Sequence, residues 1–168
     1  MQAETLSTYR ILGIDPGTHV TGLGIIEIAK GLDPQLCYYG TIKTRRSDGL
    51  PFRLQQIYQG LLAVIERYQP DYIALEDIFY SENIKTAIVM GHTRGIALLA
   101  IVNTGRKPAE YSPREVKLAV VGRGSAAKEQ VQFMVKNILH LNEDIKPADA
   151  ADALAVALCH YHRMRTVQ

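Results

Sequence analysis

The chain has 168 residues, a formal net charge of +2, and 47% hydrophobic and 21% charged residues. This length suits a single domain over residues 1–168 with a buried core, and the composition excludes an intrinsically disordered chain. The near-neutral total also excludes a protein that binds nucleic acid through overall charge alone.

The cysteines and the apolar runs indicate a cytoplasmic protein with no membrane partner. Cys37 and Cys159 stand far apart outside any CxxC pattern, which favours neither a disulfide scaffold nor a zinc site. The first ten residues contain no apolar core of a signal peptide. The most apolar run, residues 96–102, is much shorter than the ~20 residues of a membrane-spanning helix.

Three short apolar segments open the predicted fold. Residues 9–15 end in an Asp-Pro-Gly turn, residues 20–29 form a second apolar run, and residues 36–44 are rich in β-branched and aromatic side chains. Short links containing Gly, Pro or Asp join the segments. This pattern predicts three antiparallel strands.

The periodicity then changes to alternating helices and strands. Apolar residues at helical spacing predict a helix over residues 51–68, and the run at 71–76 predicts a buried strand parallel to the first. A long helix is expected over residues 83–103. Its Gly91 and Gly95 would either allow close approach of another helix or reflect simple core packing against the sheet.

The C-terminal part carries clear signals at the ends of its elements. Residues 107–111 predict a fifth strand. Ser112 and Glu115 form a capping-box pattern that opens a short helix ending at Gly122.

Two further helices complete the chain. Ser125 is expected to cap a helix reaching about residue 140, and Pro147 to open a last helix reaching about residue 164. The order of elements predicts an α/β fold. Its five-stranded mixed sheet has three antiparallel strands followed by parallel ones, and helices flank it.

Four acidic residues occupy the ends of these elements. Asp15 ends the first strand, Glu76 ends the fourth, and Asp149 and Asp152 share one face at the start of the last helix. Each alone has an ordinary explanation: a turn Asp, a strand end that reaches water, or acids favoured by the helix dipole. The alanines around Asp149 and Asp152 would let that helical turn pack closely and aim both acids at the sheet.

If the first and fourth strands are neighbours, all four acids meet at one edge of the sheet. Clustered carboxylates repel one another unless a cation neutralises them. Oxygen ligands without His or Cys favour Mg²⁺ or Mn²⁺ over zinc, and we expect His160 and His162 on the surface of the last helix instead. Two ions roughly 3.5–4 Å apart support phosphodiester hydrolysis. The sequence therefore predicts a divalent-metal site that cuts a nucleic-acid backbone.

Basic residues concentrate between residues 106 and 136. This segment holds seven Lys and Arg against three Glu, a net +4 that leaves −2 for the remainder. Such a segment is typical of a phosphate-facing surface, and also of a solvated mixed face. The candidate DNA-binding residues within it are Arg114, Lys117, Arg123 and Lys128. Weaker candidates elsewhere are Arg45, Arg46, Arg53, Lys85 and Arg94.

Two aromatic residues lie in the loop expected after Glu76. Phe79 and Tyr80 would stack on unpaired bases if exposed there, and such stacking contributes about 1–3 kcal/mol per base. The alternative is that one of them anchors the loop to the core.

Five stretches occur in order across nearly the whole chain: ILGIDPG (11–17), LEDIF (75–79), VKLAVVG (116–122), GSAAK (124–128) and DAADALA (149–155). Together they resemble the RuvC family of bacterial crossover-junction endodeoxyribonucleases. The resemblance implies a ribonuclease-H-like fold and a homodimer. It also implies Mg²⁺-dependent resolution of four-way (Holliday) DNA junctions by paired nicks in recombination and repair. A branch-migration helicase complex of the RuvA–RuvB type is the implied partner.

The resemblance also assigns roles to residues. It places the family's catalytic, metal-binding acids on Asp15, Glu76, Asp149 and Asp152. It places the basic residues near the scissile phosphate on Lys117 and Lys128, and the junction-stacking aromatic on Phe79.

Three other interpretations compete with this one. Residues 13–22 resemble the first phosphate loop of actin-like sugar kinases and chaperone ATPases, but those folds need two such domains and a second glycine-rich loop. A related ribonuclease-H-like nuclease that acts on RNA is the second. A catalytically inactive junction-binding module is the third, and the intact set of acids argues against it.

Overall fold

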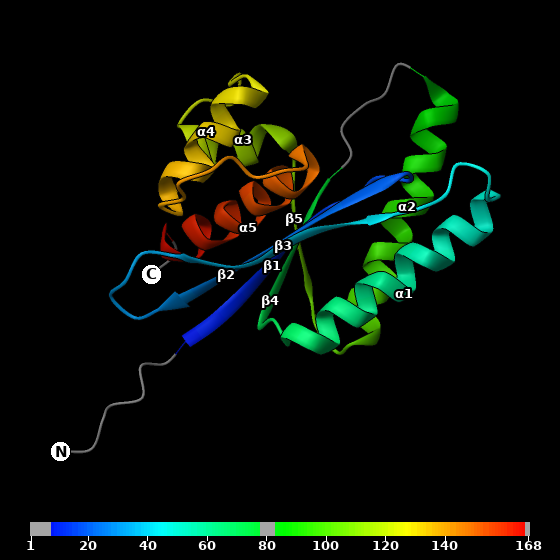
Figure 1. Ribbon diagram of the computed structural model, residues 1–168, viewed down its shortest axis with the longest axis horizontal. Coiled ribbons are helices and arrows are strands. Elements are labelled where there is room, and N and C mark those ends of the chain that lie inside the picture. Colours follow the sequence, from blue (N-terminus) through cyan, green and yellow to red (C-terminus); the bar gives the residue numbers. More distant parts are fainter. Residues whose placement is uncertain (1–7, 78–82, 167–168) are drawn as a thin grey trace.

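The computed structural model describes residues 8–77 and 83–166. These residues form one five-stranded sheet in the order β3-β2-β1-β4-β5 (Figure 1). The strands are β1 (Thr8–Asp15), β2 (Val20–Ala29), β3 (Gln35–Lys43), β4 (Tyr72–Glu76) and β5 (Pro108–Tyr111). β1, β2 and β3 pair antiparallel, whereas β4 and β5 are added in parallel to β1. The predicted mixed sheet is confirmed, and each strand lies within one residue of its predicted bounds.

Helices cover both faces of the sheet (Figure 1). On one face lie α1 (Leu50–Tyr68) and α2 (Ile84–Asn103). On the other lie α3 (Pro113–Val121), α4 (Lys128–Ile138) and α5 (Ala148–Thr166).

Alternate residues along each strand supply two separate cores. Leu12 and Ile25 are fully buried against α1 and α2. Their sequence neighbours Ile11 and Ile26 are fully buried on the face covered by α3, α4 and α5. By the same alternation, side chains at positions 13 and 15 of β1 and 22 and 24 of β2 belong to the α5 face.

Most helix ends follow the signals in the sequence. At α3 the Ser112 hydroxyl accepts the Glu115 backbone N–H at 3.3 Å, and the Glu115 carboxylate accepts the Ser112 N–H at 2.9 Å, so the capping box is confirmed. The predicted Ser125 cap is wrong, because α4 begins only at Lys128. The Gln130 side chain accepts the Ala127 N–H at 3.0 Å, and this bond takes over part of the capping role.

The two glycines of α2 do not pack against the sheet. Gly91 and Gly95 are exposed, and no atom lies near the position that a Cβ would take on either. Among the described residues, α2 is also the one helix long and apolar enough to cross a membrane, with a mean hydropathy of 1.3. Its opposite face nevertheless packs within the fold, where Ala97 and Ile101 are fully buried.

Three glycines on one face of β1 and β2 allow α5 to approach the sheet. Gly13 and Gly24 lie opposite each other across the two strands, and Gly22 lies opposite Asp15. A Cβ on any of the three would overlap α5, and at Gly22 it would overlap the carbonyl group of Asp149. The absence of side chains here brings the helix backbone against the strand backbone.

This contact predicts that Gly22→Ala destabilises the protein. The added methyl has to push the first turn of α5 off the sheet, and overpacking of this kind costs about 3 kcal/mol. Gly49→Ala is the matched control, because the nearest atoms to its new methyl lie at an ordinary 3.8 Å, and it should cost about 0.5 kcal/mol as a weaker N-cap. Urea unfolding of both variants measures the difference, and equal losses would contradict the proposed contact.

Candidate active site

Asp15 and Glu76 lie side by side at the ends of neighbouring parallel strands. The preceding residues, Ile14 and Leu75, are register partners, so the expectation that the first and fourth strands are neighbours is confirmed. Both acids follow the alternation that points their side chains to the α5 face. Each is largely withdrawn from water at the end of a buried run.

The first turn of α5 brings Asp149 and Asp152 to the same edge. The charges of both residues act on Asp15, and the charge of Asp152 also acts on Glu76. Asp152 Oδ2 lies 2.6 Å from the ammonium nitrogen of Lys128, the first residue of α4. The structure therefore brings together the four acids that the sequence singled out, with one lysine among them.

Burial and mutual repulsion alter the ionisation of the two strand-end acids. Burial, the charge of Asp15 and a hydrogen bond with Asp15 raise the pKa of Glu76 to about 8. Burial and the charge of Asp152 raise the pKa of Asp15 to about 6. Near pH 7 the metal-free pair therefore retains a proton, which Glu76 donates to Asp15.

The donor set suits a hard divalent cation. Its ligands are carboxylate oxygens, the type that Mg²⁺ and Mn²⁺ prefer. Within residues 8–77 and 83–166, however, no three acidic, His or Cys side chains are gathered closely enough to hold an ion as they stand. Asp152 is engaged by Lys128, so an ammonium group supplies part of the positive charge that the cluster requires.

A small cavity of about 180 Å³ opens on the acids. Glu76 and Asp152 line it together with Lys117 and Lys128. Two acids and two cations thus share one hollow, an arrangement suited to a phosphate group bound between a metal ion and lysine side chains.

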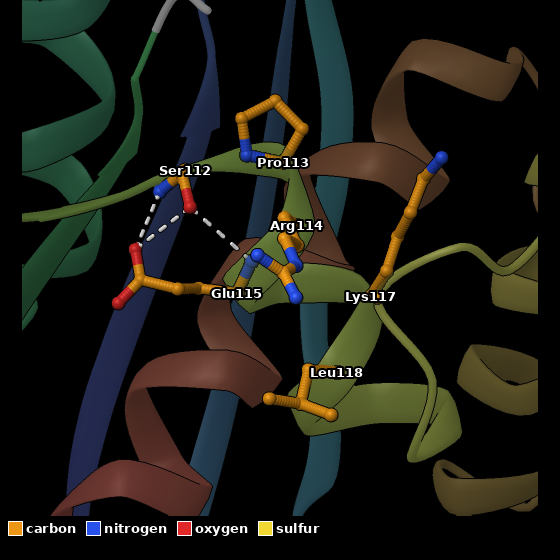
Figure 2. Close-up of a pocket in the computed structure, with 7 residues that line it drawn as sticks. Ser112, Pro113, Arg114, Glu115, Lys117 and Leu118 are labelled. Atoms are coloured by element: carbon orange, nitrogen blue, oxygen red, sulfur yellow. Dashed lines mark hydrogen bonds between the residues drawn. The ribbon is translucent and has the colours of Figure 1, made fainter.

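A larger cavity of about 710 Å³ adjoins the first along α3, and Lys117 lines both. Figure 2 shows Arg114 and Lys117 extending from α3, while the Glu115 carboxylate is turned toward Ser112. Glu115 also pairs with Arg163 at 3.0 Å. This surface therefore presents positive charge, and its one acid is already neutralised.

Other predicted DNA-binding residues lie in different surroundings. Arg123 is exposed and donates to Gln130 at 3.4 Å. Phe79 and Tyr80 lie outside the described residues. The weaker candidate Arg94 forms ion pairs with Asp77 and Glu110, so it belongs to the fold rather than to an open arm-binding surface.

The expectation that His160 and His162 are surface residues is wrong. Both are half-buried. His160 forms a hydrogen bond with the Tyr111 hydroxyl at 2.8 Å, and His162 forms one with the Ala119 carbonyl at 2.9 Å. Both residues belong to α5, and each ring bonds to a neighbouring element, His160 to β5 and His162 to α3.

Sequence reasoning missed the glycines that admit α5. Their signal is present, because Gly22 and Gly24 are two residues apart and therefore share one face of a strand. Glycine inside a strand often marks a close approach of another backbone.

The raised pKa values predict an unusual pH dependence for the metal-free protein. Asp15 and Glu76 hold protons in the folded state that the unfolded chain releases near pH 4, so the contribution of these two acids to stability is fully present below that pH. It should fall by about 2–4 kcal/mol as the pH rises through about 6 and about 8.

Urea unfolding in EDTA at pH 5, 6.5 and 8 measures this slope. Glu76→Gln should flatten it, and Mg²⁺ should restore stability at pH 8. A wild-type profile that is flat or rises over this range would contradict the assigned ionisation.

Comparison with known proteins places this geometry in a family. A family model described as crossover junction endodeoxyribonuclease RuvC matches residues 11–160. The RuvC of Desulforamulus reducens is 52% identical over 150 residues, covering 89% of this chain and 91% of that protein. The RuvC of Caldanaerobacter subterraneus subsp. tengcongensis is 49% identical over 153 residues, covering 91% and 92%.

A solved structure agrees with these relatives. Thermus thermophilus RuvC in complex with a Holliday junction substrate matches with a TM-score of 0.88 and 34% identity, over 95% of this chain and 96% of that one. The predicted ribonuclease-H-like fold is thereby confirmed. The chain belongs to the RuvC family of crossover junction endodeoxyribonucleases.

Proposed function

We propose that this protein is a structure-selective endonuclease that resolves four-way DNA junctions by paired symmetric nicks in recombination and repair. One observation carries the proposal: the four acids meet at one sheet edge, and two of them, Glu76 and Asp152, line a cavity together with Lys117 and Lys128. The Thermus relative, 34% identical, is described with a Holliday junction as its substrate.

Asp15, Glu76, Asp149 and Asp152 would hold Mg²⁺, with Mn²⁺ as a substitute and two ions in each subunit. Metal held there would supply the chemistry of water activation and of charge stabilisation at the leaving oxygen of the phosphodiester. The protein's own contribution is to gather four carboxylates against their repulsion and to keep them partly shielded from water. The cations beside them then favour the charged phosphate.

Basic residues complete the proposed DNA surface. Lys117 and Lys128 would offset negative charge at the scissile phosphate, since both line the cavity of the acids. Arg114 and Arg123 would contact the backbone nearby, which contributes affinity without sequence readout. The roles of Phe79 and Tyr80 in stacking on junction bases remain predictions.

The exposed face of α2 supports a homodimer. Ile84, Ile88, Leu99 and Val102 are 74%, 55%, 49% and 56% exposed, and they follow helical spacing with the two exposed glycines between them. Contiguous apolar surface of this kind marks an interaction site. A two-fold pair of α2 helices would place two active sites on one junction, which paired nicks require.

The cellular setting follows from the same proposal. A branch-migration helicase complex of the RuvA–RuvB type would deliver the junction, and the protein would act in the cytoplasm, where the chromosome of a bacterium lies. The acids are present as a complete set, so an inactive binding module is the weaker alternative.

Asp15→Asn should abolish cleavage of a mobile four-way DNA junction. The loss should be about 1,000-fold or more because the variant lacks a metal ligand, while junction binding changes little. Incubation with and without Mg²⁺, and gel-shift titration in EDTA, separate the two effects.

Asp33→Asn is the matched control, because that acid is exposed in the β2–β3 turn. Full nicking by Asp15→Asn would overturn the assignment of the active site. Preferential cleavage of a structured RNA by the wild type would favour the RNA nuclease instead.

Ile88→Glu should convert the dimer into a folded monomer. The new charge lies within the apolar face of the proposed α2 pair, and Ile88 is 55% exposed in the single chain, so folding is not affected. Leu32→Glu, at a similarly exposed residue in the β2–β3 turn, should remain dimeric. Sedimentation equilibrium distinguishes the states. A wild-type monomer at micromolar concentration, or a dimeric Ile88→Glu, would refute this interface.

A further inference from the structure

The loop that follows Asp15 is held by threonine hydroxyl groups. Thr21 donates to the Gly17 carbonyl at 2.8 Å, and Thr44 donates to the Thr18 carbonyl at 2.7 Å. Both bonds tie the loop to neighbouring parts of the same sheet.

A third bond ties this loop to α2. The hydroxyl oxygens of Thr18 and Thr93 lie 3.0 Å apart, and both side chains are buried. Thr93 donates its single proton to the Val89 carbonyl at 3.2 Å. With Thr93 donating to Val89, Thr18 donates to Thr93 and the protons of both hydroxyls are used.

The next residue of α2 holds the other strand end. Arg94 Nε lies 3.0 Å from Asp77 Oδ1, and its guanidinium also pairs with Glu110 of β5. Asp77 directly follows Glu76, and its N–H donates to the Tyr111 carbonyl at 2.7 Å. Arg94 is 28% exposed, whereas Asp77 and Glu110 are 44% and 38% exposed, so the two ion pairs lie at the surface and act mainly by fixing geometry.

We propose that Thr93 and Arg94 are positioning residues for the acid cluster. Thr93 holds the loop that follows Asp15, and Arg94 holds Asp77, the residue that follows Glu76. Because Thr93 and Arg94 are adjacent on one rigid helix, they set the spacing of the two carboxylates. The cluster needs such a restraint because its acids repel one another. This inference rests on the proposed metal site, and neither residue is assigned contact with metal or DNA.

Mn²⁺ binding to the full chain tests the inference, measured by calorimetry and electron paramagnetic resonance at one fixed pH of 8. Thr93→Val and Arg94→Gln should each weaken binding about tenfold, in the range found when residues that orient metal ligands are changed. Thr93→Ser should restore wild-type affinity, because it restores the hydroxyl. Thr86→Val and Arg67→Gln are the controls; both residues are exposed on helices, and both variants should bind Mn²⁺ like the wild type.

Thr18→Val removes the same Thr18–Thr93 hydrogen bond by changing the loop residue. It therefore serves as the test variant if Thr93→Val does not fold. The double variant Thr18→Val/Thr93→Val should be no weaker than either single variant, which assigns the effect to one shared bond. Mn²⁺ affinity within twofold of the wild type in Thr93→Val, Thr18→Val and Arg94→Gln would overturn the proposal, even if melting temperatures fell.

Asp15→Asn, measured in the same series, separates this inference from the proposed function. If Asp15→Asn alone loses Mn²⁺ binding, the assignment of the metal site is supported and the positioning role of Thr93 and Arg94 is refuted. Unchanged binding in Asp15→Asn would instead refute the metal site itself.

Discussion

The contact between α5 and the bare face of β1 and β2 is the constraint on which the rest of the site depends. Gly22 lies opposite Asp15 and beneath the carbonyl of Asp149. Because Gly22 has no side chain, the helix turn that carries Asp149 can lie next to the strand end that carries Asp15. Small residues on α5, such as the fully buried Ala153, continue this close fit along the helix. A helix separated by ordinary side chains would lie about 10 Å from the sheet and would carry its acids away from the strand ends.

Gathering the acids opposes folding, and the surroundings offset only part of that cost. A proton shared between Glu76 and Asp15 removes one negative charge, and the ammonium group of Lys128 compensates Asp152. What remains is a partly shielded site with more negative than positive charge. The same imbalance that weakens the metal-free fold favours binding of a divalent cation, so the cost in stability and the affinity for metal have one origin.

Local signals explain why much of the fold could be predicted. Strand alternation, the turn after Asp15 and the capping box at Ser112 are encoded within a few residues each, and all three are found in the structure. The acids could be grouped because strand ends meet at one sheet edge. The start of α4 could not be predicted, because Gln130 caps it from inside the helix, whereas Ser125 carries the sequence signal of a cap. Pairings between distant segments, such as Thr18 with Thr93, leave no local pattern to recognise.

The two faces of α2 explain its unusual composition. A helix that only covered a sheet would be polar on its outer side, but here that side carries Ile84, Ile88 and two bare glycines, which gives the helix the apolarity of a membrane span. Its inner side carries Thr93 and Arg94, which bind the segments behind Asp15 and Glu76. A buried hydroxyl pair and an arginine paired with two acids have no use in a lipid-exposed helix. They are explained by a helix that packs on the strands of the acid cluster, and the proposed second subunit would cover its apolar outer side.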